Sequence, residues 1–127
     1  MKILIISQHY YPENWRINDI SFELSKRGHD VTVLCGYPNY GEGEIYDGYR
    51  RRERKEHRDE IINGVHVIRC NEHPRKHSKI HLFLNYYTAC FSMMRKARIM
   101  KEKFDVVLIN QLAPVMQARA GLVYAKK

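Results

Sequence analysis

The chain has 127 residues, a length suited to one domain, and its 22 Lys and Arg against 14 Asp and Glu give a formal net charge of +8. Hydrophobic residues make up 44% and aromatic residues 11%, which excludes intrinsic disorder. The apolar run Ile3–Ile6 is too short for a signal peptide or a membrane span, and the three cysteines form no CxxC pair. We therefore expect a cytoplasmic protein with no metal and no cofactor of its own, whose charge favours anionic partners.

The first three elements form a βαβ pattern. Lys2–Ser7 is an apolar run typical of a strand buried on both faces of a parallel sheet. Trp15–Lys26 places its apolar residues on one helical face and ends before Gly28, the usual helix stop. Asp30–Cys35 is a second β-branched strand, so the two strands are predicted to pair in parallel.

A hairpin is predicted next. Asn63-Gly64 lies between alternating apolar residues, which is the strongest short hairpin pattern. The charged run Arg50–Glu60 is interpreted as the outer strand, because charges protect a sheet edge, and Val65–Cys70 as the inner strand.

The last third of the chain adds a helix, a strand and a helix, over Ile80–Lys103, Asp105–Asn110 and Val115–Lys127. The resulting fold class is α/β, a Rossmann-like doubly wound, mostly parallel sheet with a hairpin edge. Counting only the buried strands, we expect the order 3-2-1-4. A further strand would complete this sheet, so we expect a single incomplete domain over 1–127 whose open edge self-associates or meets a separate chain.

This topology places the expected site. The strand order reverses between the first and fourth strands, and ligands of open α/β sheets bind outside the carboxyl ends at such a reversal. The loops Ser7–Asn14 and Asn110–Pro114 meet there. The first of them has no glycine, which excludes a standard dinucleotide-binding turn.

Histidines recur every four residues at His73, His77 and His81. Pro74 interrupts the helix that would align them, and no Asp or Cys joins them. Solvated loop histidines are therefore favoured over a metal site.

Tyrosines gather in the loops that follow the first two strands. Packing against the domain is one interpretation, and stacking of sugar rings is the other. The tyrosines are Tyr10, Tyr11, Tyr37, Tyr40, Tyr46 and Tyr49.

The long helix combines aromatic residues with a basic end. Core packing explains its apolar residues in one interpretation. In the other, the helix lies on an anionic membrane through Arg95, Lys96, Arg98 and Lys101.

Several motifs together resemble glycosyltransferase family 4. Tyr10-Tyr11-Pro12-Glu13 after the first strand and Arg27-Gly28-His29-Asp30-Val31 resemble the opening of that family. The loop with Pro38-Asn39-Tyr40 and Gly48-Tyr49-Arg50 is similar to members that build bacterial capsule, O-antigen and lipopolysaccharide sugars. Asn63-Gly64-Val65 and Asp105-Val106-Val107 fall where the family has corresponding strands.

The resemblance implies the acceptor-side part of a retaining enzyme of the GT-B fold. A C-terminal domain, absent here, would hold the nucleotide sugar, so the chain alone is expected to be inactive. The acceptor would be a lipid-linked saccharide at the inner membrane face. Asn14-Trp15-Arg16 stands where the family often has Gly-Gly, and Arg16 is the cation that would replace that backbone contact.

The expected acceptor-binding residues lie in three loops. They are Tyr11, Glu13, Asn14 and Arg16, then Pro38, Asn39 and Tyr40, and finally Asn110 and Gln111. The alternative function is a non-catalytic subunit that recognises a polyprenyl-phosphate sugar at the membrane. No motif supports nucleic-acid binding.

Overall fold

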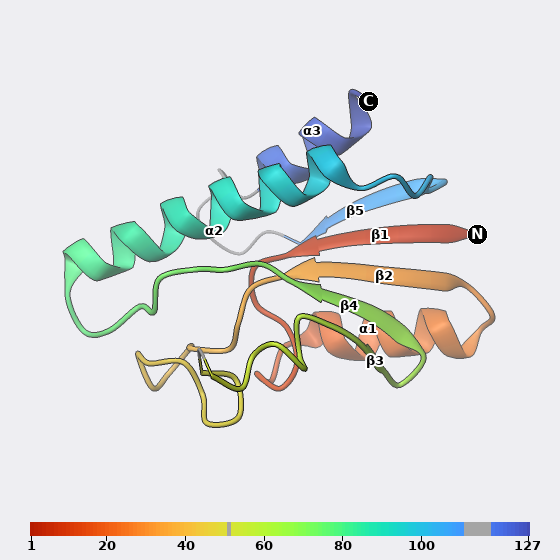
Figure 1. Ribbon diagram of the computed structural model, residues 1–127. Coiled ribbons are helices and arrows are strands. Elements are labelled where there is room, and N and C mark those ends of the chain that lie inside the picture. The colour runs from red at the N-terminus through yellow and green to blue at the C-terminus, as the bar shows by residue number, and fades with distance from the viewer. Residues whose placement is uncertain (51, 111–117) are drawn as a thin grey trace.

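The computed structural model describes residues 1–50, 52–110 and 118–127. It has a five-stranded sheet with α1 on one face and α2 and α3 on the other (Figure 1). The elements are β1 (Lys2–Ser7), α1 (Arg16–Lys26), β2 (Asp30–Cys35), β3 (Asp59–Ile62), β4 (Val65–Arg69), α2 (Lys79–Ile99), β5 (Val106–Asn110) and α3 (Arg119–Ala125).

The sheet is mostly parallel, in the order β3-β4-β2-β1-β5. β1 pairs in parallel with β2 and β5, β2 pairs in parallel with β4, and only β3 is antiparallel. This order differs from the four-strand series 3-2-1-4 because the hairpin strand β3 takes a place of its own at one edge. The chain reverses its winding direction between β1 and β5, and the result is an α/β sheet compatible with a Rossmann-like fold.

The hairpin is shorter than the sequence predicts. Asn63 and Gly64 both have positive φ, of 48° and 80°, as a two-residue hairpin turn requires. The outer strand covers only Asp59–Ile62, so the prediction of a strand over Arg50–Glu60 was wrong for most of its length. Residues 52–58 form successive turns, with the Arg54 and His57 amides donating to carbonyls three or four residues earlier. A run of charged residues has little β-branched or aromatic surface to pack on a neighbouring strand.

Each face of the sheet carries its own core. Ile3, Ile5, Val31 and Val33 pack with Ile17 on the α1 face. Leu4, Ile6, Leu34, Met93 and Ala97 pack on the α2 face. Successive strand residues point to opposite faces, so covering both faces demands the continuous apolar runs seen in the sequence.

The long helix ends four residues earlier than predicted and begins one residue earlier. α2 starts after Ser78, whose Oγ accepts from the His81 amide, and it ends at Ile99 rather than Lys103. Met100 leaves the helical conformation and buries its side chain in the α2-side core. The next residues run back to the sheet, where Asp105 exchanges hydrogen bonds with Lys2. The predicted helix over Val115–Lys127 is described as Arg119–Ala125, and residues 115–117 lie outside the described ranges.

Candidate functional site

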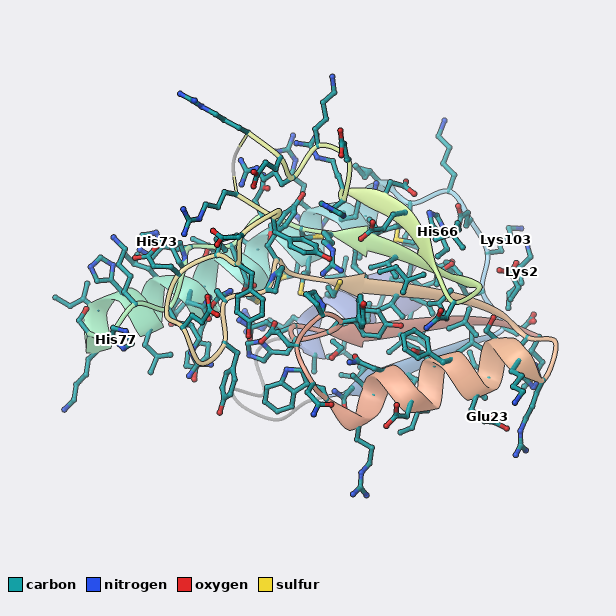
Figure 2. All side chains as sticks on the ribbon, turned by 90° about the horizontal axis from the view of Figure 1, so that it is seen from below. Lys2, Glu23, His66, His73, His77 and Lys103 are labelled. Atoms are coloured by element: carbon teal, nitrogen blue, oxygen red, sulfur yellow. The ribbon has the colours of Figure 1, made fainter. Side chains whose placement is uncertain are left out.

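The carboxyl ends of β1, β2 and β4 point toward the same end of the molecule, where the loops after these strands gather (Figure 1). His73 and His77 lie at this end, while Lys2 and Lys103 lie at the opposite one (Figure 2). We refer to the two as the carboxyl end and the amino end of the sheet. Open α/β sheets bind ligands at the carboxyl end.

Three rings in the loops after β1 and β2 form a cluster that we call the aromatic platform: His9, Trp15 and Tyr40. The His9 and Trp15 rings stack with centroids 5.2 Å apart. The Tyr40 ring meets both edge-on, 4.8 Å from Trp15 and 5.4 Å from His9. Tyr40 is exposed, Trp15 is half-buried and His9 is buried, so the platform runs from the surface inward.

The Glu13 carboxylate holds this platform together. It is 4% exposed, and it accepts hydrogen bonds from Trp15 Nε1 at 3.4 Å and from the Tyr40 amide at 3.2 Å. His9 Nδ1 lies 3.3 Å from it. The Glu13 carbonyl in turn accepts from Asn18 Nδ2 of α1 at 2.7 Å. The buried Glu13 carboxylate therefore joins the Trp15 side chain to the backbone of the loop after β2, which makes it a positioning group.

A second buried acid, Glu72, lies in a set of side-chain amides that we call the amide cage: Gln8, Asn39 and Asn85. Gln8 Nε2 and Asn39 Nδ2 each donate to Glu72 at 2.9 Å, and Asn85 Nδ2 donates at 3.3 Å. Burial raises the pKa of Glu72 to about 8, although the hydrogen bonds from Gln8 and Asn39 oppose that shift. The carboxyl therefore holds its proton to a much higher pH than an exposed glutamate.

Gly36 leaves room for Glu72. A Cβ at position 36 would lie 2.3 Å from Glu72 Oε1, closer than atoms can approach. The glycine after β2 is thus required by the acid rather than by its own backbone angles.

Arg69, at the end of β4, ties the loops to the sheet. It is 3% exposed, and its guanidinium donates to the Tyr11 carbonyl at 2.6 Å and to the Gly36 carbonyl at 3.2 Å. It also lies over the Tyr49 ring, 5.0 Å from the centroid, and 3.6 Å from Glu60 Oε1. The loops after β1 and β2 are therefore bound to β4.

Small cavities open around this end of the sheet. One, of about 210 Å³, is lined by Glu72 with Tyr37, Tyr49 and Arg54 among others. Another, of about 230 Å³, is lined by Tyr40, Gly41, Gly43, Arg75, Lys76 and His77.

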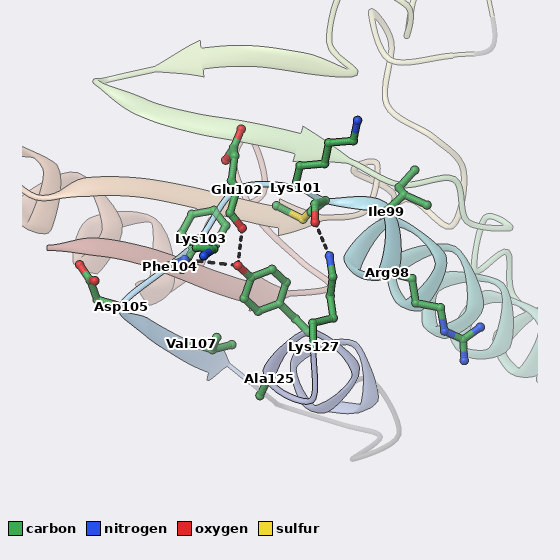
Figure 3. Close-up of a pocket in the computed structure, with 12 residues that line it drawn as sticks. Arg98, Ile99, Lys101, Glu102, Lys103, Phe104, Asp105, Val107, Ala125 and Lys127 are labelled. Carbon is green, nitrogen blue, oxygen red and sulfur yellow. Dashed lines mark hydrogen bonds between the residues drawn. The ribbon is translucent and has the colours of Figure 1, made fainter.

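A wider cavity, of about 1020 Å³, lies instead at the amino end, between the turn after α2 and the end of α3 (Figure 3). Its rim consists of exposed residues such as Lys101, Glu102 and Lys103. At this rim the Tyr124 hydroxyl accepts from the Phe104 amide and donates to the Glu102 carbonyl. We place the candidate site at the carboxyl end, because among the residues that the structure describes it is there that buried acids and aromatic rings meet, in the loops that follow β1, β2 and β4.

The expected site residues differ in their placement. Glu13 and Tyr40 contact each other directly. Pro38 and Asn39 are buried, and Asn39 belongs to the amide cage. Tyr11, Asn14 and Arg16 are exposed near the platform. Asn110 Nδ2 donates to Ser7 Oγ at 3.0 Å, which links the ends of β1 and β5, and Gln111 lies outside the described residues.

Sequence reasoning did not select five residues of the aromatic platform and of Glu72 with its amide cage: Gln8, His9, Trp15, Glu72 and Asn85. Glu72 follows β4 by three residues, at the carboxyl end where polar residues gather, and that position was an available clue. Asn85 is a polar residue in an otherwise apolar part of α2, and that break in the apolar pattern was the second clue.

The histidines do not form a metal site in the described part of the chain. His73 Nε2 and His81 Nδ1 are 2.8 Å apart and the rings stack. Burial and the neighbouring His81 lower the pKa of His73. Among the residues that the structure describes, no three His, Cys, Asp or Glu side chains gather as metal ligands.

Comparisons with models of known protein families, with curated proteins and with solved structures find no match to this chain. The functional conclusions below therefore rest on the chain's own residues.

Proposed function

We propose that this chain is the acceptor-binding part of a retaining glycosyltransferase of the GT-B type. The full reaction would break the bond between the anomeric carbon of a nucleotide sugar and its diphosphate. The same carbon would then join an acceptor hydroxyl, whose proton is released. The nucleotide sugar would be held by a separate donor-binding domain, and the acceptor by the site described above. The resemblance to glycosyltransferase family 4 supports this assignment.

The observation that carries the proposal is the aromatic platform set on Glu13 at the reversal of the strand order. Apolar sugar faces pack on aromatic rings while sugar hydroxyls bond polar groups around them. Tyr40 and Trp15 offer such rings at the surface, and Glu13 fixes both through hydrogen bonds. In this assignment Tyr40 and Trp15 contact the acceptor, and Glu13 and Glu72 position the loops.

Trp15 provides a direct test, because it is the only tryptophan in the chain. Titration with saccharides should change the tryptophan fluorescence of the 127-residue chain, whereas glycerol at equal concentration should not. Tyr40→Ala should weaken the saccharide response at least about fivefold, since it removes a ring from the platform. Phe91→Ala, an exposed ring on α2, is the matched control and should leave the response unchanged. A response to no saccharide in a panel of hexoses, amino sugars and deoxy sugars would contradict the proposal.

We also propose that the acceptor is lipid-linked and that α2 rests on the membrane surface. Phe83, Tyr87 and Phe91 recur every four residues with 57%, 37% and 62% of each side chain exposed. Their rings follow one another along the helix, with centroids 4.2 Å and 6.3 Å apart. Arg95 and Arg98 continue this stripe four and seven residues beyond Phe91. Exposed aromatic rings followed by cations are typical of helices that bind anionic membranes from the surface.

None of the helices in the described ranges has the length and apolar character needed to cross a bilayer. What we propose is peripheral binding at the membrane surface. Co-sedimentation with vesicles of anionic lipid should retain the chain at low salt and lose it as salt rises, because screening shortens the range of these charges. Arg95→Glu with Arg98→Glu should abolish retention, while Arg52→Glu with Lys55→Glu, the same charge change elsewhere, should not. Equal binding to neutral vesicles would contradict it.

A further inference from the structure

A basic pocket lies directly beside the aromatic platform. It has a volume of about 230 Å³ and is lined by Tyr40, Gly41, Gly43, Arg75, Lys76 and His77. Arg75 lies over the face of the Tyr40 ring, 5.0 Å from its centroid, and 5.7 Å from that of Tyr86. Tyr40 is thus a wall shared by the pocket and the platform.

The cations of this pocket lack acidic partners within the described residues. No carboxylate oxygen lies within 4.0 Å of the Arg75 or Lys76 side-chain nitrogens there. Glu42 and Glu44 belong to the adjoining loop but do not line the pocket. Two unpaired cations and a histidine, held around a space of this size, leave a positive potential without a counter-charge.

The backbone holds these cations in place. Lys76 adopts a left-handed conformation with φ of 45°, which is uncommon for a residue with a side chain. Its amide donates to the Gly43 carbonyl, so the turn that carries the cations is bonded to the loop after β2. Gly43 has φ of 76°, and a Cβ there would lie 3.1 Å from Lys76 Cα and from His77 Nε2. An uncommon backbone conformation costs free energy, and residues held in one by the surrounding structure are often found at functional sites.

We propose that this pocket binds the phosphate or diphosphate group of a phosphorylated saccharide whose sugar ring lies on the aromatic platform. The inference rests on the proposed function and specifies its substrate class, an acceptor with phosphate next to the sugar. Arg75 bonds the phosphate oxygens through its planar fork, and Lys76 adds a point charge. A free saccharide fills the platform alone and binds more weakly.

Titrations that follow Trp15 fluorescence separate the two sites. Glucose 1-phosphate should bind the 127-residue chain about tenfold more tightly than glucose, as charge-assisted hydrogen bonds to phosphate predict. Arg75→Gln and Lys76→Gly should remove most of this advantage, measured for each variant as the ratio of its glucose 1-phosphate affinity to its own glucose affinity. Glycine at position 76 accepts the left-handed angle, so the second variant removes the ammonium group without straining the turn. Lys79→Ala, which removes a nearby charge outside the pocket, is the matched control.

The possible outcomes are distinct. Equal affinities for glucose and glucose 1-phosphate would overturn the phosphate pocket and leave the platform standing. Binding of neither compound, with other saccharides also silent, would overturn the proposed function itself. Uridine diphosphate is the second probe, because a donor nucleotide also carries a diphosphate. Arg75-dependent binding of uridine diphosphate that matches or exceeds that of glucose 1-phosphate would overturn the assignment to the acceptor.

Discussion

The two ends of the sheet hold their polar groups in opposite ways. At the carboxyl end, Glu13, Glu72 and Arg69 are buried, and protein hydrogen bonds fix them all. At the amino end, Lys101, Glu102 and Lys103 are exposed and line the wide cavity of about 1020 Å³ (Figure 3). The carboxyl end has smaller cavities but holds buried charged groups in fixed positions, whereas the wide cavity at the amino end is bordered by exposed charged residues.

The difference shows why cavity size is a poor guide to a site. Burying a carboxyl group costs free energy unless hydrogen bonds replace its water. Two acids at the carboxyl end, Glu13 and Glu72, are buried and receive such hydrogen bonds. Their partners belong to the loops, so the two acids stabilise loop positions and not the sheet core. Lys101 and Lys103, which are exposed at the wide cavity, incur no such cost and can take many rotamers.

The largest expected effect tests the space that Gly36 leaves for Glu72. Gly36→Ala should lower the free energy of unfolding by about 3 kcal/mol, because the new methyl overlaps Glu72 Oε1. Gly41→Ala is the matched control. It has φ of 85° but no heavy atom within 4 Å of the added carbon, so only the backbone cost of about 1 kcal/mol applies. Urea denaturation measures both, and equal losses would show that the carboxyl end tolerates repacking.

The strands were predictable because their signal is local. Lys2–Ser7 and Asp30–Cys35 are apolar at nearly every position, which only a strand covered on both faces requires, and the structure confirms both ranges. The outer hairpin strand failed because a mixed-charge run fits an edge strand or solvated turns equally well. Its local propensity, rather than its neighbour across the turn, decided the outcome.

The candidate site includes some residues that the sequence analysis selected and others that it did not. The reversal of strand order pointed to the loop after β1, and Glu13 and Tyr40 were selected from residues near such ends. The amide cage was not predicted, because its contacts join residues far apart in the chain. Gln8 reaches Glu72 across 64 positions and Asn85 across 77. No local pattern in a single sequence encodes those pairings, and the three polar residues alone resemble ordinary loop and helix-surface residues.

The second prediction concerns the pH dependence that Glu72 imposes. Its pKa rises from 4.5 to about 8 on folding, so between these values the native state binds a proton that the unfolded state has lost. Stability therefore falls as pH rises through this window and is fully present only below it. Glu72→Gln should remove that slope, so its free energy of unfolding should exceed that of the parent chain at pH 9.

Denaturation midpoints at pH 5, 7 and 9 check this effect. Glu23→Gln is the control, since Glu23 is an exposed carboxyl on α1 paired only with Arg27 (Figure 2). Its pH profile should follow that of the parent. Parallel profiles for Glu72→Gln and the parent would mean that the amide cage stabilises the ionised acid, and the contrast between the two ends would weaken.

The smallest effect compares one hydroxyl from each region. The Tyr10 hydroxyl is buried and lies 2.6 Å from Ser21 Oγ, while the Tyr124 hydroxyl bonds two backbone groups at the rim of the amino-end cavity. Tyr10→Phe should cost about 1–2 kcal/mol, because Ser21 keeps only its bond to Asn18 and water cannot replace the other. Tyr124→Phe should cost about 0.5–1 kcal/mol, since solvent at the rim can rebond the Phe104 amide and the Glu102 carbonyl. Thermal denaturation of both variants against the parent measures the difference. A larger loss for Tyr124→Phe would mean that the amino end is held as firmly as the carboxyl end.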